Sequence, residues 1–80
     1  VYKSTVTTMI EVYVTNVTKK KDSVFLKREL LTLLPTANIH FDLQDCDRIL
    51  RIENLTSELL PELVIACLER NGFKCELLTD

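Results

Sequence analysis

Apolar and polar residues alternate along residues 9–17, and this period of two predicts a half-buried β-strand. One face of the strand carries its aliphatic side chains, and we expect this face to cover the core: Ile10, Val12 and Val14. The opposite face is then expected to be open to solvent, with the polar and aromatic side chains Glu11, Tyr13 and Thr15.

The period changes to that of a helix between Asp22 and Leu34. Asp22 or Ser23 is expected to cap the first backbone N–H groups, and Pro35 to end the helix. The predicted core stripe consists of leucines at helical spacing, namely Leu26, Leu30, Leu33 and Leu34.

Alternation returns in residues 37–43 and, after a polar turn at residues 44–47, in residues 48–53. This pattern predicts two antiparallel strands, the second with Leu50 and Ile52 facing the core. A second helix is expected over residues 57–71, ending at Asn71-Gly72, and residues 73–77 give a last short strand. The core stripe of this helix is predicted to be Leu60, Leu63, Val64, Cys67 and Leu68.

The order of these elements is β-α-β-β-α-β, with connections of a few residues. Right-handed crossovers place both helices of such a chain on one face of its sheet. We therefore expect an α+β fold of ferredoxin-like topology, in which a four-stranded antiparallel sheet has the strand order 4-1-3-2. Residues 9–80 are expected to form this single domain, and residues 1–8 an N-terminal extension or linker.

Composition and charge narrow the function classes. Eighty residues are too few for two cores, and 46% apolar with 28% charged residues is an ordinary globular balance. A net charge of −2 gives no general attraction to nucleic acid or anionic membranes. No apolar run approaches the ~20 residues of a transmembrane helix. Three unclustered cysteines favour a reducing compartment, so we expect a cytoplasmic protein.

Three short strings, in this order and spacing, are similar to one known family. Leu34-Pro35 ends the first helix, Phe41-Asp42-Leu43 closes the second strand, and Asn71-Gly72-Phe73 joins the second helix to the last strand. Over residues 9–78 the chain resembles a heavy-metal-associated (HMA) domain. The resemblance implies the ferredoxin-like fold and, in members with an intact site, a loop Gly-Met-Thr-Cys-x-x-Cys that binds Cu(I) or Zn(II).

The corresponding loop of this chain, residues 16–23, contains neither cysteine nor glycine. A lysine and an acid or serine stand where the family has its thiolates: Lys19 and Asp22, or Lys20 and Ser23. Soft thiolates are what Cu(I) and Zn(II) chaperoning requires, and a protonated ammonium is not a metal ligand. We therefore expect a degenerate family member with no cofactor and no catalytic residues.

The favoured function is a non-catalytic interaction or adaptor module whose partner is another protein. Lys19, Lys20 and Lys21 precede a helix N-terminus, where a positive field attracts an anion or an acidic partner. The second strand, at the edge of the sheet, is the other candidate contact, for a partner or for a weak homodimer. Nucleic acid is not an expected partner, because the open sheet face lacks stacking aromatics in a basic setting. A membrane is not expected either, because the net charge of −2 gives no attraction to an anionic surface.

Two alternatives stay open. The first is metal binding through surrogate ligands, Cys46 and Cys75 with Asp45 or Asp47, which the topology places at one end of the sheet. The second is a small-ligand regulatory domain, although such domains place a glycine after the first strand and this chain does not. Cys67 and Cys75 fall on apolar faces, so Cys46 is the thiol expected to be exposed. His40, the single histidine, is expected on a strand surface without a catalytic role.

Overall fold

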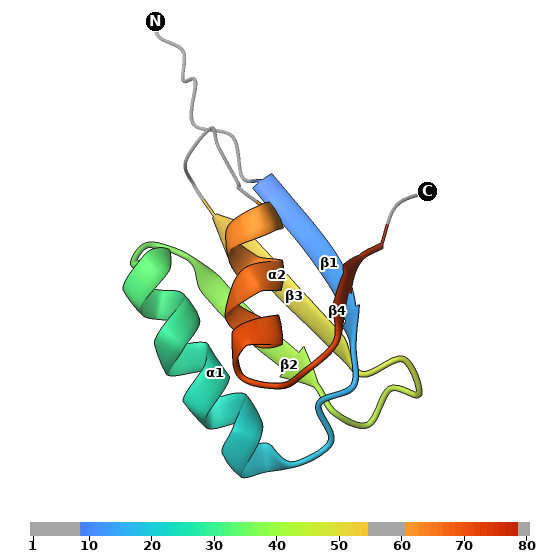
Figure 1. The fold of residues 1–80 in the computed structure, drawn as a ribbon. Helices are drawn as coiled ribbons and strands as arrows, with labels where there is room; N and C mark the ends of the chain where they lie inside the picture. The colour runs from blue at the N-terminus through green and yellow to red at the C-terminus, as the bar shows by residue number, and fades with distance from the viewer. Residues whose placement is uncertain (1–8, 55–60, 79–80) are drawn as a thin grey trace, which may run out of the picture.

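The computed structural model describes residues 9–54 and 61–78. Along the chain the elements are β1 (Met9–Thr15), α1 (Lys20–Leu33), β2 (Asn38–Asp42), β3 (Ile49–Asn54), α2 (Pro61–Arg70) and β4 (Cys75–Leu77). The strands form one antiparallel sheet in the order β2-β3-β1-β4, which reads β4-β1-β3-β2 from the other edge. Both helices cover the same face, with α1 over the β2 side and α2 over the β4 side (Figure 1). The α+β class expected from the sequence is confirmed.

Helix α1 begins at Lys20 rather than at the predicted Asp22. Its N-cap residue is Lys19, which makes no side-chain capping hydrogen bond. The predicted capping by Asp22 or Ser23 is therefore wrong, because both residues lie inside the first turn, where the Ser23 hydroxyl donates to the carbonyl of Lys20 at 2.7 Å. Asp22 still places a carboxylate near the positive end of the helix macrodipole.

Helix α2 ends in the left-handed turn that Asn71-Gly72 predicts. Gly72 has φ 88°, a conformation that other residues rarely adopt. The N–H of Phe73 donates to the carbonyl of Leu68 at 2.9 Å, and the N–H of Gly72 to that of Glu69 at 3.0 Å. This pair of bonds is a Schellman motif, which satisfies the last carbonyls of the helix and turns the chain into β4.

The core lies between the two helices and the inner face of the sheet. As predicted, Leu50 and Ile52 of β3 are buried. Two of the predicted helix core positions are largely uncovered, since Leu33 is 39% and Leu63 is 40% exposed, and Leu60 lies outside the described residues. The buried apolar set is Tyr13, Val17, Leu26, Leu30, Ala37, Ile39, Leu50, Ile52, Val64, Cys67, Leu68 and Cys75.

Strand β1 faces the opposite way from the sequence prediction. Tyr13 is fully buried, whereas Ile10 is 51% exposed. Directly opposite residues of an antiparallel pair share a face, and Tyr13 lies opposite the buried Leu50. The helices therefore cover Glu11, Tyr13 and Thr15, and the predicted inward face is the open one: Ile10, Val12 and Val14.

Hydrogen bonds satisfy the polar atoms that this orientation brings inward. The Tyr13 hydroxyl donates to Glu11 Oε1 at 2.6 Å. The Thr15 hydroxyl donates to the carbonyl of Arg48 at 2.6 Å and accepts from the N–H of Val17 at 3.2 Å. Val17 continues the same alternation and is fully buried, so Tyr13 and Val17 supply the apolar volume on this side of β1. Burial of partnered polar groups costs little compared with unpartnered ones.

Neither α1, with 14 residues, nor α2, with 10, is long and apolar enough to cross a lipid bilayer.

Candidate interaction surfaces

The lysine-rich segment forms the start of α1. Lys19 is the N-cap residue, Lys20 and Lys21 occupy the first turn, and all three are exposed. The segment before them is tied to the start of β4, because Asn16 Oδ1 accepts the backbone N–H of Lys74 at 2.8 Å. The three ammonium groups repel the positive end of the helix macrodipole and reinforce a local positive field. None of them is a metal ligand at neutral pH.

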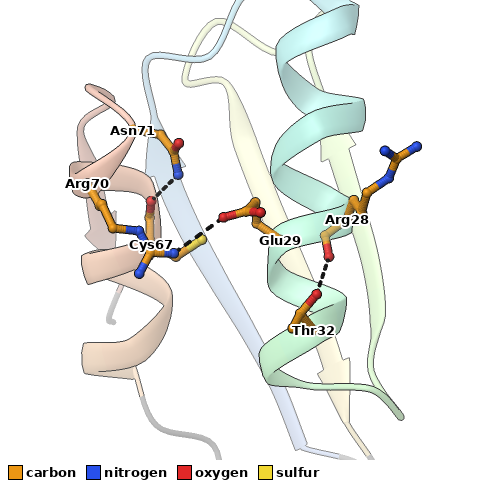
Figure 2. Close-up of polar contacts among 6 residues, drawn as sticks. All are labelled: Arg28, Glu29, Thr32, Cys67, Arg70 and Asn71. Carbon is orange, nitrogen blue, oxygen red and sulfur yellow. Dashed lines mark hydrogen bonds and ion pairs between the residues drawn. The ribbon is translucent and has the colours of Figure 1, made fainter.

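The charges of α1 are sorted onto two sides of the helix. Glu29 faces α2, where its Oε1 lies 3.4 Å from the guanidinium of Arg70, and Asp22 stands two turns earlier on the same side. Residues two positions away from Glu29 are turned by about 200° around the helix, so Lys27 and Leu31 face away from α2. Figure 2 shows Arg28 pointing away from α2 and Glu29 pointing toward it.

We call the side of α1 that faces away from α2 the basic flank. Its lysines repeat at a spacing of seven residues, as do its aliphatic side chains, so that both kinds alternate along the helix. The basic residues and Val24 are exposed, and Leu31 is half-buried. The basic flank consists of Lys20, Val24, Lys27, Arg28 and Leu31.

The basic flank borders strand β2, whose outer edge has no neighbouring strand within residues 9–54 and 61–78. Helix α1 packs against β2, and it lies over this side of the sheet (Figure 1). Phe41 of β2 packs against the core but remains half-buried at the edge. The lysine-rich segment and the edge strand, which are separate candidates in the sequence, are thus parts of one side of the molecule.

The open face of the sheet carries an aliphatic patch. Ile10, Val12 and Val14 of β1 lie on this face, Ile49 stands opposite Val14, and Leu78 stands beside Val12, to whose carbonyl its N–H donates at 2.8 Å. Ile10 and Leu78 are 51% and 54% exposed, and the other three are half-buried. We call these five residues the aliphatic patch.

The rest of the open face is polar. His40 lies opposite Arg51, and Arg51 pairs with Glu53 at 2.8 Å. A shallow hollow on this side is lined by residues that include His40, Asp42 and Arg51. No nucleophile stands beside the His40 imidazole in that lining, and a guanidinium does not act as a base partner. Of the predicted open-face residues, Tyr13 and Thr15 are instead buried, which removes the single aromatic expected there.

The structure places the candidate metal ligands in two different settings. Asp45, Cys46 and Asp47 of the β2–β3 turn have potential ligand atoms within 4.8 Å of one another. One carboxylate oxygen of Asp45 already accepts the N–H of Asp47 at 2.8 Å. Cys75 is not a member of this group; it is buried on the inner face of β4, opposite Thr15. The exposed turn offers a single soft ligand, which is a poor match to a Cu(I) site.

Burial also changes the chemistry of the two core thiols. Burial, together with the nearby carboxylate of Glu69, raises the pKa of the Cys75 thiol from its ordinary value of 9.0 to about 12. Burial likewise raises the pKa of Cys67, which lies between the helices, although Arg70 partly opposes the rise (Figure 2). A raised pKa lowers the fraction of each thiol that is present as the nucleophilic thiolate, so both core thiols are poor nucleophiles.

No protein-family model matches the chain, and no curated protein or solved structure shows significant similarity to it. The structure defines the molecule by its own geometry. That geometry is a small α+β domain with an antiparallel four-stranded sheet, two helices on one face and an aliphatic patch on the other.

We expect thiol reagents to distinguish the three cysteines. Cys46 is exposed, so it should react first in the native protein at pH 8, whereas the buried, protonated thiols of Cys67 and Cys75 should react more slowly by at least about tenfold. Mass spectrometry of peptides after timed alkylation measures the three rates, and labelling in denaturant is the control in which they converge. Equal native rates would contradict the placement of Cys67 and Cys75 in the core.

We also expect no chaperone-like binding of Cu(I) by the reduced protein. The start of α1 offers ammonium groups and no thiolate, and the β2–β3 turn offers a single cysteine. A competition titration against a chromophoric Cu(I) chelator checks this, with Cys46→Ser as the matched control. Tight one-to-one binding that disappears in Cys46→Ser would show a surrogate site and contradict the expectation.

Proposed function

We propose that this domain is a non-catalytic protein-interaction module: an HMA-like domain of ferredoxin-like topology that has lost its thiolate metal site. The order of the helices and strands and the strings Leu34-Pro35 and Asn71-Gly72-Phe73 support the topology and the resemblance. Lysines at the start of α1, where the family has its metal loop, support the loss of the site.

The observation that carries the proposal is the aliphatic patch on the open face. Val12, Tyr13 and Val14 are three consecutive apolar residues, so β1 carries apolar side chains on both of its faces. Such runs are typical of strands that are covered on both faces, whereas half-exposed strands alternate cleanly. The helices cover only the Tyr13 face of β1. Contiguous exposed apolar patches mark interaction sites, and here the patch lies over the centre of the sheet.

The occupant of the open face that we propose is a second copy of this chain. In this dimer the open faces of two sheets pack against each other. The two-fold axis lies in the plane of the interface, perpendicular to the strands, and passes between the two copies of Val12. It therefore places Val12 over its own counterpart and Ile10 over Val14 of the partner. Because the patch is aliphatic throughout, it is complementary to itself, as an isologous interface requires. Arg51, the nearest cation, is already paired with Glu53 at 2.8 Å, so its repulsion of the partner's Arg51 is reduced.

Five aliphatic side chains form only a small interface core, so we expect a weak dimer with a dissociation constant on the order of micromolar or above. Sedimentation velocity should show the average mass rising above the 9.2 kDa of one chain as the protein concentration is increased. Val12→Lys places a charge at the centre of the patch and should weaken association by at least about tenfold, without a large loss of stability, because Val12 is not part of the core.

Asn38→Lys is the matched control, because it adds the same charge to the same face at the edge strand, away from the patch. It should leave the association unchanged. A wild-type protein that stays at one-chain mass at every concentration would contradict self-association through this face. Equal weakening by both substitutions would contradict the position of the interface.

A further inference from the structure

We propose that the free edge of β2 and the basic flank of α1 together form a binding site for an extended segment of a partner protein that combines aliphatic and acidic residues. In this site the segment adds a strand to the sheet next to β2. The site lies on the edge of the sheet and not on the open face, so it does not depend on the self-association proposed above.

The backbone of β2 provides the first requirement. β2 consists of five residues and pairs with β3 along its whole length, which leaves the backbone groups of its other side directed toward the edge. A row of unpaired backbone N–H and C=O groups is a template for an incoming strand. Asn38, His40 and Asp42 are polar and point to the open face, so they do not close off this edge.

Side chains on the helix side of the edge provide the second requirement. Residues of an added strand would alternate between the open face and the helix side. On the helix side they would meet the half-buried Phe41 and Leu31, and beyond these the exposed Val24. Alternate residues of the ligand are therefore expected to be aliphatic.

Charge provides the third requirement and decides the class of ligand. Three cations lie along the basic flank, and the acids of α1 stand on the side of the helix that faces α2, where Glu29 is paired with Arg70. The basic flank creates a local positive field on a chain whose net charge is −2. Such a field favours an acidic partner. Carboxylates on either side of the aliphatic residues would reach Lys20 and Lys27.

The same charges argue against a second copy of this chain at the β2 edge, the homodimer contact expected from the sequence. Pairing of two β2 strands would bring the basic flanks of both copies toward each other, with lysines on both sides of the two-fold axis. Like charges brought together are unfavourable. An acidic strand relieves this repulsion, whereas a second copy increases it.

A peptide with the sequence Glu-Glu-Val-Thr-Val-Thr-Val-Glu-Glu is a suitable probe, because its central five residues match the length of β2. Fluorescence anisotropy with a labelled probe should show saturable binding that weakens as salt is raised, since screening shortens the range of the charge interaction. The corresponding peptide with glutamine in place of glutamate should bind at least about fivefold more weakly.

Two variants of the protein test the location of the site. Lys27→Glu reverses a charge on the basic flank and should weaken probe binding about fivefold or more. Lys74→Glu makes the same charge change next to β4 at the opposite edge of the sheet, and should change the affinity by less than about twofold. Both residues are exposed, so thermal unfolding should confirm that the fold is kept. Equal effects of the two substitutions would overturn the proposed location.

Backbone methylation of the probe tests strand addition itself. One version carries N-methyl groups on its threonines and the other on its valines. Only one of these two sets of amides can point toward β2, so one version should lose binding and the other should keep it. If both versions bind as well as the unmodified probe, or if no probe binds at all, the proposal is wrong. Self-association in sedimentation is a separate measurement, so either proposal can fail without the other.

Discussion

The inward orientation of Tyr13 in the central strand is the feature on which the other surfaces depend. The Tyr13 ring fills the space between the sheet and the helices, and its hydroxyl donates to Glu11 at 2.6 Å. Burial, together with this bond to a carboxylate, raises the pKa of the phenol, so the ring stays neutral and continues to donate. Once Tyr13 points inward, period-two alternation requires Val12 and Val14 to point outward. The aliphatic patch is therefore a direct consequence of the packing of one aromatic residue.

The packing of the two helices places the acidic and basic side chains of α1 on different sides of that helix. Glu29 and Arg70 join the two helices on the side where they meet, and Lys20, Lys27 and Arg28 lie on the outer side of α1. The outer side of α1 is also the side of the free β2 edge. An aliphatic face and a basic edge thus lie on different sides of the same sheet. The first suits a self-complementary contact, and the second suits an extended acidic strand.

Periodicity predicted the elements well, because each helix and strand in the structure corresponds to a segment with the matching period. The inner faces of β2 and β3 were also predictable, since Ile39 lies between two polar residues and the charged Arg51 separates Leu50 from Ile52. In β1 both faces contain apolar residues, and alternation identifies two faces without saying which one the helices cover. Val17 is buried and shares its face with Tyr13, so it was the residue in the sequence that could have identified the inner face of β1.

The candidate surfaces were predictable only in part. The lysines stand out in the sequence, but their position relative to the edge strand depends on the side of α1 that faces α2. That side is marked by a contact between residues 29 and 70, which lie far apart in the sequence. The start of α1 was misplaced because Asp22 and Ser23 are favourable caps, whereas Lys19 takes that position without a side-chain bond.

The orientation of β1 is tested most directly by comparing the free energies of unfolding of Tyr13→Ala and Val12→Ala. Removal of a fully buried aromatic side chain should cost about 3–5 kcal/mol, whereas removal of two methyl groups from the open face should cost less than about 1 kcal/mol. Urea denaturation followed by circular dichroism measures both values. A larger cost for Val12→Ala than for Tyr13→Ala would mean that the aliphatic face of β1 covers the core, and would contradict the account.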